Sequence, residues 1–215
     1  MQKDFPNKLD YYTGEMRQFG GRPTIGSGIP RDVVTTYRPL ESDSTHAIYT
    51  VNYRDSSQSQ DWYCFLKRDD GSWKIEAVRC LALPGFAYTL LNSPEGSPAL
   101  PDSLRRVQNS LRLLVRSDNQ LKQYLKDRLE QFTRLVNLSK SDSIESRKLC
   151  DHLSVLGCKS SPEYKGCTLI TVCGIVDNTV GYIYATDGAV LPRMSPSEYI
   201  YIEEVLPHWY VFKTT

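Results

Sequence analysis

The chain has 215 residues, of which 40% are hydrophobic and 24% are charged, and its 26 basic and 25 acidic residues leave a formal net charge of +1. This length suits one large domain or two small ones with their own cores, and the composition excludes long disordered stretches. The balanced charge excludes a whole-protein field that attracts nucleic acid or an anionic membrane, and no run of 18 apolar residues predicts a transmembrane helix.

The N-terminal stretch MQKDFPNKLDYY lacks the apolar region of a signal peptide. We therefore expect a cytoplasmic protein by default, and a periplasmic or secreted one if a signal peptide has been removed. One short helix is expected near residues 7–19. The glycine-rich stretch QFGGRPTIGSGIP, residues 18–30, leads into the β-prone residues Val33 and Val34 and has no lysine placed for a phosphate, so we interpret it as a structural loop.

The sequence of residues 31–80 predicts a β-rich region. Short runs of Val, Ile, Thr, Tyr and Trp between turn-forming clusters predict four strands, at 31–40, 45–54, 61–68 and 72–80. Asp70-Gly71 predicts a tight hairpin between the last two strands. The second run alternates between two faces, which predicts a sheet with one covered and one wetter side. Its mostly apolar face carries Ala47, Tyr49, Val51 and Tyr53.

The stretch IYTVNY followed by WYCFLKRDDGSWKIEAVRCL, within residues 47–81, resembles the terminal strands of NTF2-like (cystatin-like α+β) domains. That family often ends on a Phe-rich strand, an Asp-Gly turn and a Trp-Lys-Ile strand. The resemblance implies a curved sheet with a pocket or a protein-binding face. It carries over no catalytic residue, and the long helices that precede the sheet in that family have no counterpart in the first thirty residues.

After the β-rich region, the chain becomes rich in prolines and glycines. Residues 92–101 are the best linker candidate, which predicts a first domain at 1–91 and a second at 102–215. Within 102–157, apolar residues spaced three and four apart predict three consecutive helices. They begin at Asp102 or Ser103, at Ser117 or Asp118, and at 141–143.

The last part of the chain, 168–215, returns to β-structure in two predicted hairpins, one turning at Asn178 and one at Pro207. Segregated helices and antiparallel hairpins indicate an α+β fold. We expect an antiparallel β-rich N-terminal part, followed by three helices packed on a four-stranded antiparallel sheet.

Aromatic residues gather in these last two hairpins. Because residues two apart share a face of a strand, Tyr182 and Tyr184 should lie together, as should Tyr199 and Tyr201. If the isoleucines between them meet the helices, the rings form an exposed surface typical of binding sites; the alternative is a second core layer or a domain interface. The candidate binding residues are Tyr182, Tyr184, Arg193, Tyr199, Tyr201, His208 and Trp209.

The sequence contains no catalytic or metal-binding signature. His46, His152 and His208 have no metal-ligand spacing, and no GxSxG nucleophile motif occurs. We therefore expect no catalytic residue, no metal and no cofactor.

The six cysteines contain no CxxC pair, so we interpret them mainly as buried free thiols. If a disulfide forms, Cys158 and Cys167 are the most plausible pair, because they flank the loop KSSPEYKG.

The helical segment 102–140 carries nine basic and four acidic residues. Its basic positions scatter over several helix faces without an aromatic platform for bases, which favours a solvated helix face over nucleic-acid binding.

These features favour a non-enzymatic binding or accessory protein of bacterial type that recognises a protein partner through the aromatic sheet face. An immunity or inhibitor protein for a toxin fits within this class. The alternative is a hydrolase-like enzyme with a histidine and a carboxylate in a site between the two parts. A third hypothesis is a nucleic-acid binder that uses the basic helices. The sequence leaves the partner and the oligomeric state open.

Overall fold

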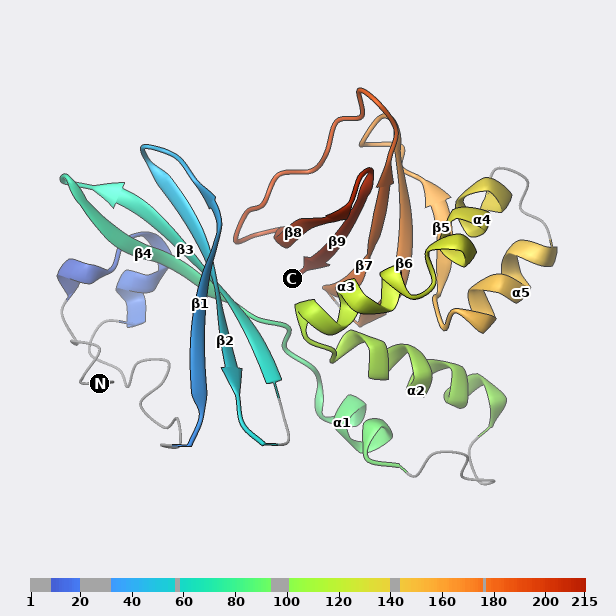
Figure 1. Cartoon of the computed structure of the whole chain (residues 1–215). Coiled ribbons are helices and arrows are strands. Elements are labelled where there is room, and N and C mark those ends of the chain that lie inside the picture. The colour runs from blue at the N-terminus through green and yellow to red at the C-terminus, as the bar shows by residue number, and fades with distance from the viewer. Residues whose placement is uncertain (1–8, 20–31, 57–58, 94–100, 140–143, 176) are drawn as a thin grey trace. The chain divides into compact units, whose positions relative to one another are not determined.

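The structure is a computed structural model that describes residues 9–19, 32–56, 59–93, 101–139, 144–175 and 177–215 (Figure 1). Two compact units make up the chain, residues 1–80 and residues 81–215. Each unit has its own antiparallel sheet, so the predicted α+β fold class is confirmed. We expected the first domain to end at residue 91, whereas the compact units group 81–91 with the second part. Most of the predicted linker, 94–100, lies outside the described residues.

The sheet of the N-terminal unit has the order β1-β2-β3-β4, and all neighbouring strands are antiparallel. Its strands are β1 (Val34–Ser42), β2 (His46–Arg54), β3 (Ser59–Asp69) and β4 (Ser72–Arg79), as predicted. Asp70 and Gly71 form the turn between β3 and β4 with φ values of 51° and 75°. This pair of left-handed residues is what a two-residue hairpin turn requires, so the Asp-Gly prediction is confirmed.

A short segment before the sheet lies along β4, and we call residues 9–19 the N-terminal strap. It contains two 3-10 helices, η1 (Leu9–Tyr11) and η2 (Gly14–Phe19), in the region where one short helix was expected. Tyr12 forms a parallel bridge with Ile75, and the Thr13 N–H donates to the Ile75 carbonyl oxygen at 2.9 Å. The strap is thereby attached to the edge strand β4. The predicted glycine-rich loop lies mostly outside the described residues, from residue 20 onward.

The sheet of the C-terminal unit has the order β5-β6-β7-β9-β8 and is also antiparallel. Its strands are β5 (Gly157–Ser160), β6 (Cys167–Ile175), β7 (Asn178–Ala185), β8 (Tyr199–Leu206) and β9 (Trp209–Thr214). The two predicted hairpins are present as β6-β7 and β8-β9. The described residues of this unit form five strands where four were expected. The additional one is the short edge strand β5, which lies before the predicted β-region 168–215 and pairs with β6 over only four residues.

The helices of this unit are α1 (Gly85–Leu91), α2 (Asp102–Leu114), α3 (Asp118–Lys126), α4 (Leu129–Ser139) and α5 (Ile144–His152). The predicted cap at Ser117 is confirmed, because its side chain and that of Gln120 form a capping box. The described residues of the region 102–157 form four helices where three were expected, since the chain breaks helical order at Asp127 and Arg128. In the described part of the chain, every helix is too short or too polar to cross a membrane.

Helices cover one face of the second sheet (Figure 1). Helix α2 packs against β6, α3 against β8 and β9, and α4 and α5 against β5. The opposite face packs against part of the long segment between β7 and β8, through Ala189 and Leu191. Both faces of this sheet therefore belong to the core.

Candidate functional site

The aromatic residues predicted to form an exposed face are mostly buried. Tyr182 and Tyr201 are fully buried, and the exposed fractions of Trp209 and Tyr199 are 5% and 7%. The prediction that these rings form an open surface is therefore wrong, and the alternative of a core layer is what the structure has.

Tyr182, and not Ile183, meets the helices. The Tyr182 hydroxyl donates to the Leu121 carbonyl oxygen of α3 at 2.9 Å. The Phe132 ring of α4 packs edge-on against Tyr182, with ring centroids 5.0 Å apart, and against Trp209 at 6.3 Å. Ile183 packs on the other face, in the cluster that includes Leu191. The long helix-facing rings fill the layer between helices and sheet, which smaller side chains would leave empty.

A β-bulge separates Tyr199 from Tyr201. The register shifts between them, so that Tyr199 lies opposite Thr214 while Tyr201 lies opposite Lys213. Tyr199 packs against Phe212 and Tyr164, with centroids 5.6 and 5.8 Å away, on the face covered by the β7-β8 segment. An inserted residue reverses the alternation of side chains, so the two tyrosines do not share a face as predicted.

The remaining candidates, Tyr184, Arg193 and His208, are half-buried or exposed. His208 occupies the β8-β9 turn with a φ of 71°, and its Nδ1 lies 3.0 Å from the Ala185 carbonyl oxygen. Tyr184 packs against Trp209 with ring centroids 5.1 Å apart. The exposed positions do not include the large rings on which the predicted surface depended, and a binding role for these three residues stays a prediction.

The histidines lie on exposed positions. His208 Nε2 is 3.8 Å from the Asp187 carboxylate, and the His46 backbone N–H donates to the Asp43 carboxylate at 2.7 Å in the β1-β2 turn. His152 is exposed at the end of α5. Among the described residues, no three His, Cys, Asp or Glu side chains gather in a way that could hold a metal ion. The hydrolase alternative concerned a site between the two units, and it stays a prediction.

Several basic side chains of the helices form ion pairs with acidic side chains or lie over an aromatic ring. Ion pairs join Arg106 to Asp151 at 3.3 Å, Arg134 to Glu145 at 3.3 Å, and Lys122 to Glu203 at 3.0 Å. Arg116 and Arg128 lie over the Tyr124 ring, 5.2 and 4.2 Å from its centroid. These contacts favour the interpretation of the basic residues as parts of the helical layer and its solvated surface.

All six cysteines are free thiols, as we mainly expected. The predicted alternative pair is wrong, because Cys158 and Cys167 lie on opposite faces of the sheet. Cys158 lies opposite Ile170, three residues from Cys167 on the same strand, and residues an odd number apart point to different faces. Burial raises the pKa of Cys158 and of Cys173 to about 11, so both thiols hold their protons at neutral pH.

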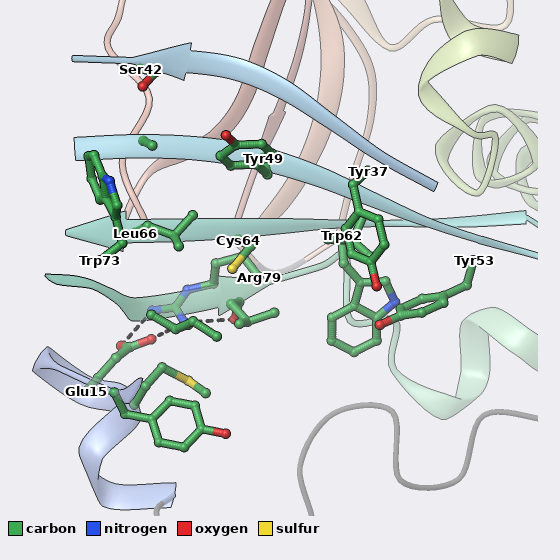
Figure 2. Close-up of a pocket in the computed structure, with 16 residues that line it drawn as sticks. Glu15, Tyr37, Ser42, Tyr49, Tyr53, Trp62, Cys64, Leu66, Trp73 and Arg79 are labelled. Atoms are coloured by element: carbon green, nitrogen blue, oxygen red, sulfur yellow. Dashed lines mark hydrogen bonds and ion pairs between the residues drawn. The ribbon is translucent and has the colours of Figure 1, made fainter. Parts of the chain in front are cut away.

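A pocket of about 780 Å³ lies on one face of the N-terminal sheet (Figure 2). All four strands and the N-terminal strap contribute to its lining. The predicted apolar face of β2 belongs to it entirely, through Ala47, Tyr49, Val51 and Tyr53. Aromatic side chains form much of the wall: Tyr12, Tyr37, Tyr49, Tyr53, Trp62 and Trp73.

Cross-strand pairing brings these side chains together. Tyr37 lies opposite Val51, which in turn lies opposite Trp62, and Tyr49 lies opposite Cys64. Because paired residues of antiparallel strands point to the same face, three strands build one continuous apolar floor. At one end Tyr37, Trp62 and Tyr53 gather, and the last two rings meet edge-on at 6.3 Å (Figure 2).

The other end of the pocket carries an ion pair between the strap and β4 (Figure 2). Arg79 donates from Nη1 and Nη2 to the two carboxylate oxygens of Glu15, the second bond being 2.7 Å long. The side chains are 24% exposed for Arg79 and 41% exposed for Glu15. This two-point pair is a planar, charge-assisted arrangement inside an otherwise apolar recess.

The described lining of the pocket includes buried polar atoms. The Tyr12 hydroxyl is buried and has no hydrogen-bond partner among the described residues. Burial raises the pKa of Tyr12 and of Tyr53, and it raises the pKa of Cys64 to about 11. The Cys64 thiol is therefore protonated at neutral pH, and no histidine lines the described walls to take its proton. The arrangement is suited to binding a molecule.

No family model, curated protein or solved structure matches the chain. The resemblance of residues 47–81 to NTF2-like domains stays a prediction.

Proposed function

We propose that the chain is a non-enzymatic binding protein whose N-terminal unit holds a small, mainly apolar molecule in the pocket described above. The pocket carries this proposal. Its volume of about 780 Å³ lies in the range of roughly 300–1,000 Å³ that is typical of small-molecule sites. Apolar walls with a few polar groups at defined points are the usual composition of such sites.

The aromatic walls supply the binding energy. Burying roughly 400 Å² of apolar ligand surface gives about 10 kcal/mol, and the loss of translational and rotational freedom offsets about 4 kcal/mol of this gain. Flat rings such as Trp62 and Tyr53 add stacking and edge contacts with a planar ligand. We therefore expect dissociation constants of about 10 μM for a planar aromatic molecule that fills part of the pocket.

The sequence placed recognition of a protein partner on the aromatic face of the C-terminal sheet. The rings of that face are buried, so we move the binding activity to the N-terminal pocket. An immunity or inhibitor role would need a different surface, and it stays a prediction.

A pocket-filling variant tests the proposal. The fluorescent probe 1-pyrenebutanol is titrated into the full chain, and its emission reports transfer from water to an apolar site. Val51→Trp places a large ring on the pocket floor and should weaken binding at least about tenfold. Thr36→Trp is the matched control, because Thr36 is exposed on β1 and is not part of the lining.

The proposal fails if the wild-type chain does not bind the probe, or if Val51→Trp and Thr36→Trp bind it equally. Circular dichroism of each variant confirms that a loss of binding is not a loss of fold.

A further inference from the structure

The ion pair at the end of the pocket bears on the chemistry of the ligand. Of the described residues that line the pocket, Glu15 and Arg79 are the two with charged side chains. An arginine at the end of an apolar recess is suited to bind a planar anion through two parallel hydrogen bonds. In this structure the planar anion is the carboxylate of Glu15.

The two partners are held differently. Arg79 ends β4, whose ladder with β3 pairs it with Tyr63, and its Nη1 also lies 3.2 Å from the Val78 carbonyl oxygen. Glu15 belongs to η2, a 3-10 helix of six residues in the strap. The backbone of Arg79 is therefore fixed by the sheet, whereas the carboxylate of Glu15 is carried by a short element.

Exchange of one carboxylate for another at Arg79 would conserve the two-point geometry. Glu15 is 41% exposed and close to water, so it can turn to solvent when another anion takes its place. An incoming ligand carboxylate would form equivalent bonds, while the body of the ligand gains contact with the aromatic walls.

We propose, building on the proposed function, that the ligand is an aromatic or otherwise apolar small-molecule carboxylate, and that its carboxylate replaces Glu15 on Arg79. Glu15 is then an internal competitor that occupies the anion site of the empty pocket. The apolar part of the ligand lies over Cys64 and Leu66 toward the rings of Trp62 and Tyr53 (Figure 2).

A matched pair of probes tests this inference: 1-pyrenebutyrate and 1-pyrenebutanol, which differ only in the terminal group. Their affinity ratio isolates the contribution of the carboxylate. In the wild-type chain we expect the carboxylate to bind about threefold more tightly than the alcohol, because Glu15 offsets part of the gain. Glu15→Gln removes the competitor and should raise the ratio by about threefold to fivefold.

Two substitutions of Arg79 and one control complete the set. Arg79→Met should reduce the ratio to one or below, since no cation remains for the carboxylate and Glu15 repels it. Arg79→Lys keeps the charge without the planar fork and should give an intermediate ratio, which covers the case in which Arg79→Met does not fold. Glu76→Gln removes a carboxylate from the same strand outside the pocket lining and should leave the ratio at its wild-type value.

The outcomes separate the two proposals. If neither probe binds, the proposed function fails. If both probes bind with equal affinity in the wild type and in Glu15→Gln, the pocket binds apolar molecules but the carboxylate inference is overturned.

Discussion

The two sheets of this protein carry similar side chains and bury them to different extents. Each sheet is antiparallel and bears a group of tyrosines together with at least one tryptophan. In the C-terminal unit, helices pack against one face and the β7-β8 segment against the other, so Tyr182, Tyr201 and Trp209 are core residues. In the N-terminal unit, one face keeps a pocket of about 780 Å³ beside the strap. The elements that cover a face, and not its ring content, decide whether the rings can bind a ligand.

The largest effect should come from Phe132, the fully buried ring of α4 that meets both Tyr182 and Trp209. Phe132→Ala should reduce the free energy of unfolding of the C-terminal unit by about 3–5 kcal/mol, because it leaves a cavity between helix and sheet. Urea unfolding measures this change in free energy. The emission of Trp209 reports it in a background with Trp62→Phe and Trp73→Phe.

Phe86→Ala is the control for this prediction. Phe86 is 61% exposed on α1, so its removal should change the stability by less than about 0.5 kcal/mol. Equal effects of the two substitutions would contradict a packed aromatic layer around Phe132.

The second-largest contrast in stability is expected from the ion pairs of the two units. Lys213 Nζ lies 2.8 Å from Asp118, with side chains only 4% and 5% exposed, whereas Arg79 and Glu15 are partly exposed. Lys213→Met leaves a buried carboxylate without its cation and should destabilise the C-terminal unit by about 3 kcal/mol. Arg79→Met should cost the N-terminal unit no more than about 1 kcal/mol.

Urea unfolding of both variants tests this contrast. The double variant Asp118→Leu with Lys213→Met removes both buried charges, and it should recover part of the stability lost in Lys213→Met. A Lys213→Met chain as stable as the wild type would contradict the buried pair.

The reactivity of Cys64 should reflect its place in the pocket. Burial raises its pKa to about 11, so at pH 8 its thiolate population should be roughly 200-fold below that of a free cysteine with a pKa of about 8.5. Alkylation by iodoacetamide should be slower by a similar factor and should rise with pH until about pH 11. Mass spectrometry of the Cys64 peptide, with N-acetylcysteine as the reference thiol, measures the rate. A rate within fivefold of the reference at pH 8 would contradict the shifted pKa.

The smallest effect concerns the β3-β4 turn of the N-terminal sheet. Gly71 has a φ of 75°, and a Cβ added there would meet no atom within 4 Å. Gly71→Ala should therefore cost about 1 kcal/mol through backbone strain alone. Gly85→Ala is the matched control, because Gly85 is equally uncrowded but does not have a left-handed φ, and it should not be destabilising. Thermal unfolding of both variants distinguishes strain from crowding.

Local signals predicted the strands and turns correctly. The apolar face of β2 and the Asp70-Gly71 turn depend on neighbouring residues, and both are found in the structure. The prediction that the other face of β2 is the wetter one is wrong, because Ile48 and Thr50 on it are buried whereas Tyr49 on the apolar face is half-buried. The same signals could not reveal the break at Asp127, because Leu121, Leu125 and Leu129 keep a helical spacing through it.

Features that depend on pairing between distant residues could not be predicted from the sequence. The bulge between Tyr199 and Tyr201 depends on how β8 meets β9, and it alone cancels the two-residue alternation. For the pocket, the residue pattern identified the face that holds Tyr49 and Tyr53, and only the resemblance to NTF2-like domains implied a pocket or a protein-binding face there. The Glu15-Arg79 pair joins residues 64 positions apart, and no motif marks it.

The three tryptophans allow one direct test of the contrast between the two sheets. Trp62 and Trp73 line the pocket, whereas Trp209 is buried in the C-terminal core. The full chain is labelled with 5-fluorotryptophan, its three resonances are assigned by single Trp→Phe substitutions, and 1-pyrenebutanol is added. We predict that the fluorine resonances of Trp62 and Trp73 shift while that of Trp209 stays in place. A shift at Trp209 alone, or none at Trp62 and Trp73, would contradict the account.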